Sequence, residues 1–245
     1  MMRDEEMAKF LIGCLDLTSL NKDDNETGII KLCEKARTPY GEVAAVCVFP
    51  KFLPVAQKAL DGSKIRLASV VNFPEGGGNI TALREEIKRA LGLGADEIDA
   101  VFPYRAFLQK DEAVCRDFLT AVKEECGEHI CKIILETGEL KRSTQIEAAS
   151  RLCLQYGVNF LKTSTGKSEV SATVEAANAM LEEIKAAGGK TGFKASGGIR
   201  TYEEARKYLV LAQVILGEDW PGRQNFRIGA SSLLKDLLRV AKGGN

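Results

Sequence analysis

The sequence contains a single histidine, His129, and its formal net charge at pH 7 is zero. A zinc-dependent enzyme normally surrounds its metal with several histidines, cysteines or carboxylates, and one histidine does not supply such a set. The 34 basic residues are dispersed and balanced by 34 acidic ones, so the positive surface typical of a nucleic-acid-binding protein is missing. We therefore expect neither a metal site nor a nucleic-acid partner.

Long apolar runs are absent as well, and no stretch approaches the ~20 residues that a membrane-spanning helix needs. The first residues, Met1–Glu6, are too acidic for a secretion signal. The seven cysteines are an odd number and contain no C-x-x-C pair, which is typical of reduced thiols in a cytosolic protein. The sequence thus predicts a cytoplasmic protein without a membrane partner.

Short apolar segments alternate regularly with amphipathic stretches along the whole chain. Helices are expected at Ile80–Leu93, Ser171–Ala187 and Thr201–Leu211, the last opening with a Thr201/Glu204 capping box. Strands are expected at Phe10–Leu15, Val43–Phe49, Ile65–Val71, Glu97–Phe102, Ile130–Leu135, Phe160–Lys162, Gly192–Ala195 and Phe226–Gly229. Eight strands, each followed by a helix, predict a single (β/α)₈ TIM barrel domain over residues 1–245.

A doubly wound open sheet would show the same alternation of strands and helices. That fold normally carries a glycine-rich nucleotide loop after an early strand. Gly92-Leu93-Gly94 lacks the third glycine of such a loop, and Gly166-Lys167-Ser168 lacks the opening glycine of a P-loop. The barrel is therefore the preferred interpretation.

Two lysines, Lys162 and Lys194, each end a predicted strand and precede small, turn-forming residues. A lysine in this position is usually a solvated charge, because burying an ammonium costs several kcal/mol unless it is compensated. On neighbouring strands, however, the two backbones would lie ~5 Å apart. Each cation would then disfavour protonation of the other, which favours a neutral, nucleophilic amine.

Catalytic residues of a barrel lie at the C-terminal ends of its strands. Period-two alternation puts Glu97, Asp99 and Val101 on one face, so we expect Asp99 to point into the barrel with the two lysines. A structural salt bridge is the alternative role for Asp99, and a small core residue is the alternative for Cys47. The residues near the eight strand ends are Asp16, Cys47, Asn72, Asp99, Glu136, Lys162, Lys194 and the segment Gly229-Ala230-Ser231-Ser232.

The loops after the last two strands indicate an anion site. Gly197-Gly198 allows the backbone to approach a ligand closely, while Ser231 and Ser232 stand at the start of the final helix, with free N–H groups and hydroxyls. Ordinary helix capping would explain the serines alone. Both loops together predict a phosphorylated substrate, because barrels frequently bind phosphate at this place.

Several of these segments resemble, in the same order, the signatures of the class I deoxyribose-phosphate aldolases. The similarity extends from about Phe10 to Val240. The matching segments are Leu15-Asp16-Leu17-Thr18, Val71-Asn72-Phe73-Pro74, Asp96–Arg105, Glu136–Leu140, Phe160–Lys167, Phe193–Arg200 and Gly229–Leu234.

This resemblance implies a reversible aldol reaction that joins acetaldehyde and glyceraldehyde 3-phosphate into 2-deoxyribose 5-phosphate, without a cofactor. Lys162 would form the Schiff base, Lys194 would keep its pKa low, and Asp99 would shuttle protons with a water molecule. Asp16 and Lys167 would join this polar network. The residues implied for the phosphate are Gly197, Gly198, Ser231 and Ser232, with Thr165 and Arg200 as secondary candidates. Some family members also use a tyrosine in a mobile C-terminal tail, and the last residues here, Ala241–Asn245, contain none.

Three alternatives come from other classes of protein. A metal-dependent aldolase would need more histidines than His129, which precedes a strand and so faces the opposite end of the barrel. A pyridoxal-phosphate barrel would absorb visible light as purified. A non-catalytic phosphosugar-binding barrel would give no reason for a second buried lysine. The sequence leaves the oligomeric state open, a homodimer among the alternatives.

Overall fold

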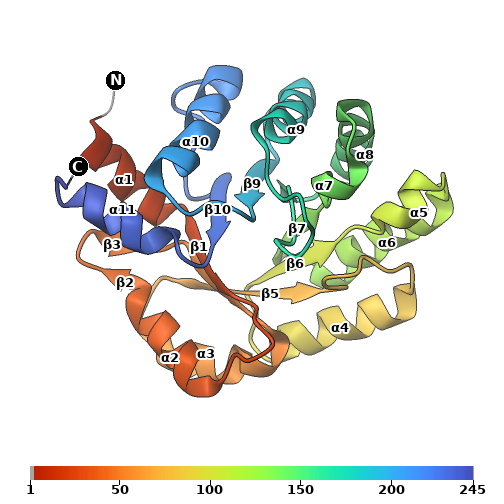
Figure 1. Cartoon of the computed structure of the whole chain (residues 1–245). Coiled ribbons are helices and arrows are strands. Elements are labelled where there is room, and N and C mark those ends of the chain that lie inside the picture. The colour runs from red at the N-terminus through yellow and green to blue at the C-terminus, as the bar shows by residue number, and fades with distance from the viewer. Residues whose placement is uncertain (1–2, 245) are drawn as a thin grey trace.

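Eight parallel strands close into a barrel in the computed structural model, which describes residues 3–244 (Figure 1). Residues 1, 2 and 245, at the two ends of the predicted domain, lie outside the described range. Strand β1 pairs with both β4 and β10, and this pairing closes the barrel. The strands are β1 (Leu15–Ser19), β4 (Ala45–Val48), β5 (Arg66–Val71), β6 (Glu97–Val101), β7 (Ile130–Ile134), β8 (Phe160–Lys162), β9 (Gly192–Ser196) and β10 (Phe226–Ala230). The predicted (β/α)₈ barrel is confirmed.

Helices surround the barrel and alternate with its strands (Figure 1). The capping box predicted at Thr201 and Glu204 is confirmed, although α10 continues to Leu216, beyond its predicted end. The helices are α1 (Asp4–Gly13), α2 (Glu26–Lys35), α3 (Leu53–Ala59), α4 (Ile80–Gly92), α5 (Tyr104–Leu108), α6 (Glu112–Cys126), α7 (Thr137–Leu140), α8 (Ser143–Gln155), α9 (Val174–Ala186), α10 (Tyr202–Leu216) and α11 (Leu233–Ala241), with a 3₁₀ turn η1 (Pro50–Phe52). A small antiparallel hairpin, β2 (Arg37–Thr38) and β3 (Gly41–Glu42), lies outside the barrel sheet.

The strand predicted at Phe10–Leu15 is wrong, because most of that segment belongs to helix α1 and the strand only begins at Leu15. The buried residues of α1 are Met7, Ala8, Leu11 and Ile12, which have the spacing of one helical face. This face packs against α11. A short apolar run fits a strand and a buried helix equally well, so the sequence pattern alone did not distinguish them.

The barrel interior has two chemically different sides. Towards β4 and β5 it is apolar, with a cluster of small buried residues that includes Ala45, Cys47, Ala68 and Val70. The other strands supply buried charges, which are Asp16, Glu97, Asp99, Lys132, Lys162, Lys194 and Arg227. A closely packed core does not explain so many ionisable groups, since each is costly to bury without a partner.

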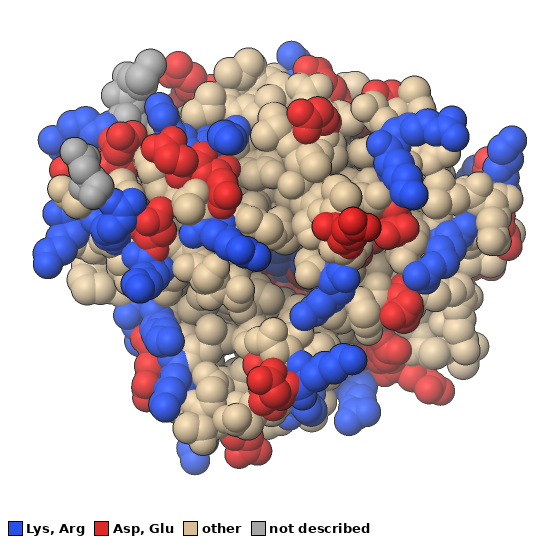
Figure 2. Space-filling model, viewed as in Figure 1, with Lys and Arg blue, Asp and Glu red and all other residues tan. Residues whose placement is uncertain are grey.

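The outer surface carries basic and acidic side chains side by side, and the visible face is hollowed near its centre (Figure 2). Within residues 3–244, no helix combines the length and the apolar character needed to cross a bilayer.

Candidate active site

The strand register brings the two predicted lysines together. Lys162 on β8 pairs in register with Lys194 on β9, and Lys194 pairs in turn with Arg227 on β10. On the other side of β8, Asp99 on β6 stands in register with Lys132 on β7. These side chains all point into the barrel, where their exposed fractions are 4% or less. The expectation that Asp99 points inward with both lysines is therefore met.

Asp99 is the acceptor that joins three lysines. Its Oδ2 accepts hydrogen bonds from the Nζ atoms of Lys162 and Lys194, both at 2.7 Å, and its Oδ1 accepts one from Lys132, also at 2.7 Å. Burial alone would raise the pKa of Asp99, but the three ammonium groups outweigh it and hold the pKa well below its usual range. Asp99 is consequently a carboxylate at neutral pH.

A second layer of charges lies beneath Asp99, and among its members only Asp16 was predicted to belong to the site. Asp16 accepts from Lys194 at 2.5 Å and from Arg227 at 2.6 Å. Glu97 accepts from Arg227 at 2.9 Å and lies 2.6 Å from the Nζ of Lys132. Lys132 and Arg227 were missed although each is a charged residue inside an apolar strand, which is the same signal that identified Lys162 and Lys194.

The three lysines differ in how well their charges are balanced. Burial tends to lower the pKa of every one, but Asp99 and Glu97 raise that of Lys132, and Asp16 and Asp99 raise that of Lys194. Lys162 pairs only with Asp99. Its pKa is lowered by burial and by the positive charge of Lys194, and Asp99 offsets this only in part. Lys162 is therefore the lysine that most easily exists as a neutral amine.

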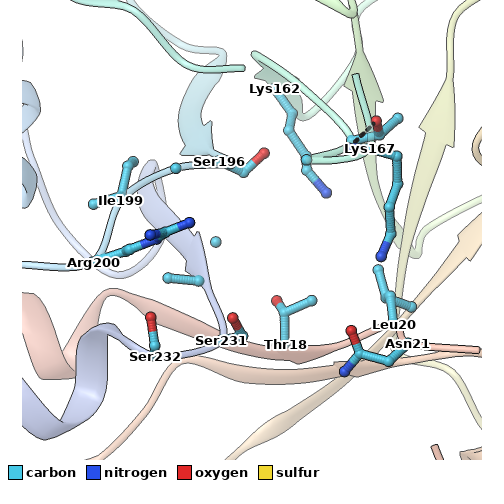
Figure 3. A pocket seen from close by; sticks show the side chains of 16 residues that line it. Thr18, Leu20, Asn21, Lys162, Lys167, Ser196, Ile199, Arg200, Ser231 and Ser232 are labelled. Atoms are coloured by element: carbon cyan, nitrogen blue, oxygen red, sulfur yellow. Dashed lines mark hydrogen bonds between the residues drawn. The ribbon is translucent and has the colours of Figure 1, made fainter. Parts of the chain in front are cut away.

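A cavity of about 210 Å³ opens above this network at the C-terminal ends of the strands (Figure 3). Of the three interior lysines in the described part of the chain, Lys162 alone lines it. Its other walls come from the ends of β1, β8, β9 and β10. The lining residues from the predicted site are Lys162, Thr165, Lys167, Gly197, Gly198, Arg200, Ser231 and Ser232. The structure thus gathers the candidate nucleophile and the candidate phosphate residues around one space.

The predicted phosphate residues form one wall of this cavity. Gly197 and Gly198 have φ values of 90° and 82°, which favour glycine, and a Cβ on Gly197 would lie only 2.6 Å from Ser171. Ser231 and Ser232 are exposed at the start of α11, and Ser232 makes no side-chain capping hydrogen bond. Ordinary capping, the alternative role for Ser232, is therefore not what its hydroxyl does here.

The remaining candidates lie at the rim or support it. Lys167 and Arg200 are exposed and contact the cavity, so Lys167 lies outside the buried ion network that it was expected to join. The hydroxyl of Thr165 donates to Glu136 at 2.5 Å, and Ser168 donates to the same carboxylate at 3.0 Å. Glu136 thereby holds the loop between β8 and α9 in place.

Three other residues singled out in the sequence have different surroundings. The side chain of Asn72 bonds to the backbone of Gly77 and Val101, so it fixes the loop after β5. Cys47 is fully buried in the apolar interior cluster, and this burial raises the pKa of its thiol to about 11. His129 is exposed immediately before β7, as expected from its place in the sequence.

Known protein structures share the fold of this chain. A candidate deoxyribose-phosphate aldolase from Coccidioides immitis is 30% identical over 96% of this chain and 87% of its own, with a TM-score of 0.84. A deoxyribose phosphate aldolase from Aeropyrum pernix is 25% identical over 97% of this chain and 92% of its own, with a TM-score of 0.77. A candidate deoxyribose-phosphate aldolase from Toxoplasma gondii, 24% identical over 99% and 98% of the two chains, has a TM-score of 0.89 and supports the fold alone.

Sequence matching to known families gives the same result for almost the whole chain. Residues 10–239 match the DeoC/LacD family aldolases, a range that contains the barrel, the charged interior and every residue of the candidate site. The chain therefore belongs to the DeoC/LacD family of aldolases.

Proposed function

We propose that this aldolase works through a Schiff base and reversibly cleaves 2-deoxy-D-ribose 5-phosphate to acetaldehyde and D-glyceraldehyde 3-phosphate. One observation carries the proposal. Lys162 is the interior lysine that reaches the cavity, and it is also the one whose charge is least balanced by carboxylates. An accessible amine with a lowered pKa is what nucleophilic attack on a carbonyl requires.

The reaction follows from the positions of these side chains. The neutral amine of Lys162 attacks the aldehyde carbon of the open-chain sugar, and loss of water gives an iminium ion. The hydroxyl next to the breaking carbon–carbon bond loses its proton to Asp99 through a water molecule, and the bonding electrons move into the iminium to form an enamine. Glyceraldehyde 3-phosphate leaves. Protonation of the enamine carbon and hydrolysis then release acetaldehyde and restore Lys162.

Lys194 and Asp16 serve this chemistry without reaching the cavity. Lys194 lowers the pKa of Lys162 by like-charge repulsion. Asp16 balances the charge of Lys194, with which it forms a buried ion pair at 2.5 Å. Lys194 therefore stays protonated while Lys162 gives up its proton. In this proposal the charge of Lys194 keeps Lys162 neutral, and Lys162 attacks the carbonyl carbon.

The phosphate of the substrate would lie against the wall formed by Gly197, Gly198, Ser231 and Ser232. This wall shares one cavity with Lys162, so a single ligand can contact both. The exposed cations Lys167 and Arg200 stand at the rim, where they attract a dianion (Figure 3). Thr165 contributes mainly through its bond to Glu136, which shapes the loop.

Two similar proteins support this substrate, since that from Coccidioides immitis is a candidate deoxyribose-phosphate aldolase and that from Aeropyrum pernix is a deoxyribose phosphate aldolase. Such a reaction belongs to the degradation of deoxyribose phosphates. A phosphosugar-binding barrel without catalysis remains the second candidate function. The buried network around Lys162 favours the enzyme, since binding alone needs no neutral lysine.

Trapping of the Schiff base tests the proposal directly. The protein is incubated with acetaldehyde and borohydride, digested, and mapped by mass spectrometry, while cleavage of deoxyribose 5-phosphate is followed in a coupled assay. We expect one ethyl group on Lys162 together with turnover. Turnover without any adduct, or an adduct on another lysine, would contradict the proposed mechanism, and an adduct without cleavage of this sugar would contradict the proposed substrate.

A further inference from the structure

The interior network contains more cationic groups than carboxylates. The cations are Lys132, Lys162, Lys194 and Arg227, and the carboxylates are Asp16, Glu97 and Asp99. Glu136 is also buried, but it binds Thr165 and Ser168 and forms no ion pair with the network. A buried surplus of one positive charge is unfavourable, so the network is most stable when one amine gives up its proton.

The hydrogen bonds identify which amine this is. Lys132 lies within 2.7 Å of both Glu97 and Asp99, and Lys194 lies within 2.7 Å of both Asp16 and Asp99. Lys162 has Asp99 alone, through an oxygen that it shares with Lys194. The proton is therefore lost most easily from Lys162.

We infer that Lys132 is a positioning residue for the reaction, and that its charge keeps the interior network one proton short and leaves the neutral amine at Lys162. This inference rests on the proposed Schiff-base function. Lys132 does not line the cavity and is completely buried, so it cannot act on the substrate itself. It acts through Asp99, whose Oδ1 it occupies, so that only Oδ2 remains for Lys162 and Lys194.

The charged groups of the barrel interior belong to this balance, whereas Lys167 and Arg200 share the cavity with Lys162 but lie at its exposed rim. The side chains that act directly on Lys162 are Asp99 on β6, Lys194 on β9 and Cys47 on β4. The other ionisable groups of the interior are Lys132 on β7, Arg227 on β10, Asp16 on β1 and Glu97 on β6. Strand β5 contributes the apolar residues Ala68 and Val70. The thiol of Cys47 is neutral at pH 7, since burial raises its pKa to about 11, and it leaves the count unchanged.

The balance of buried charges predicts opposite effects on the protonation of Lys162 when Lys132 or its partner Glu97 is replaced. Lys132→Met leaves three cations against three carboxylates, so Lys162 is held as an ammonium. Glu97→Gln enlarges the positive surplus, so Lys162 loses its proton more readily. The double variant K132M/E97Q restores a surplus of one positive charge, although it differs from the natural protein at two buried positions.

The test measures the pH dependence of Schiff-base formation alone. Wild type and the three variants are incubated with acetaldehyde and cyanoborohydride, which reduces the carbon–nitrogen double bond, and the rate of ethylation at Lys162 is followed against pH. We expect the acid limb of K132M to lie about one pH unit or more above that of wild type, as one neighbouring charge typically produces. The acid limb of E97Q should move to lower pH, and that of K132M/E97Q should return towards wild type.

A merely structural role for Lys132 would lower the labelling rate and the thermal stability without moving the acid limb. An unshifted K132M, or a double variant shifted as far as K132M, overturns the inference. If K132M does not fold, the E97Q variant tests the inference alone. An acid limb of its pH profile that is unshifted, or that moves to higher pH, overturns the inference. Failure to label the wild type at any pH would instead overturn the proposed function on which the inference rests.

Discussion

Lys162 and Lys194 donate to the same carboxylate oxygen, Oδ2 of Asp99, each over 2.7 Å. Two ammonium groups on one buried oxygen repel each other strongly, because little water is present to screen them. Lys194 has a further acceptor in Asp16, whereas Lys162 has none. Asp16 therefore distinguishes two lysines that look alike in sequence, and the accessible one, Lys162, is left with the less balanced charge.

Replacement of the proposed nucleophile, Lys162, should abolish the reaction completely. Lys162→Ala is expected to lose both turnover and borohydride-dependent labelling, because no other interior lysine reaches the cavity within the described residues. Lys167→Ala is the matched control, since Lys167 lines the same cavity but lies outside the ion network. That control should keep its adduct on Lys162. An adduct that persists in Lys162→Ala would show that another lysine is the nucleophile.

The pH profile should respond to the second lysine. Lys194→Leu removes the positive charge that lowers the pKa of Lys162, so this pKa should rise. Because attack needs the neutral amine, the acid limb of the profile moves to higher pH. A rise of about one pH unit in the pKa lowers the reactive fraction at pH 7 about tenfold. The rate of ethylation by acetaldehyde and cyanoborohydride is measured against pH. Normal turnover with an unchanged profile would remove Lys194 from this role.

Recognition of the phosphate should depend on Ser232. Ser232→Glu places a carboxylate against the phosphate, and loss of charge-assisted hydrogen bonds worth about 1.5–3 kcal/mol should lower kcat/KM for deoxyribose 5-phosphate by roughly 10-fold to 150-fold. The slow reaction of unphosphorylated deoxyribose should barely change. Ser232→Gln controls for size without charge and should be affected less. Equal losses on both sugars would indicate damage to the fold, and equal retention would place the phosphate elsewhere.

The free energy of unfolding should increase when the buried amine of Lys162 is removed. The pKa of Lys162 is lower in the folded protein than the ~10.4 of a free lysine, so between these two values the unfolded chain binds more protons and stability rises with pH. At pH 7 the buried amine is therefore destabilising. Lys162→Met should raise the free energy of unfolding by roughly 1.4 kcal/mol for each pH unit that separates the folded pKa from the unfolded one.

Denaturant titrations at pH 7 and at about pH 10 check this prediction, because the gain should shrink as the pH approaches the pKa of an unfolded lysine. Lys123→Met, at an exposed position of α6, is the control for loss of a lysine without burial. A Lys162→Met protein that is less stable than wild type at pH 7 would mean that the ion pair with Asp99 outweighs the cost of burial.

Much of the fold and the centre of the site could be predicted from the sequence. Lys162, Lys194 and Asp99 were brought together correctly because strand ends and period-two alternation are local signals. The helix α1 was mistaken for a strand because its short apolar run fits both structures. The partners of Asp16 could not be predicted, since a strand pattern shows which side chains point inward but not which of them meet across the barrel.

Lys132 and Arg227 were missed for the same reason, because a strand pattern does not show which inward-pointing side chains contact one another. Each is a lone charge inside an apolar strand, and it has meaning only through carboxylates on other strands. Lys167 was placed in the network through its resemblance to family members, whereas its backbone follows β8 and its side chain remains at the exposed rim. The sequence position of Lys167, five residues after Lys162, did not show whether its side chain is buried in the network or exposed at the rim.

Closure of the barrel by β1 and β10 has a consequence for the synthesis of the active protein. Asp16 bonds to Lys194, 178 positions later, and to Arg227, 211 positions later. During translation Asp16 on β1 therefore cannot form either ion pair until almost the whole polypeptide has left the ribosome. A nascent chain that ends before β10 already contains Lys162, but it lacks the arginine that holds Asp16 in place. The lowered pKa of Lys162 thus depends on complete folding, and fragments released early should carry an ordinary, protonated lysine at this position.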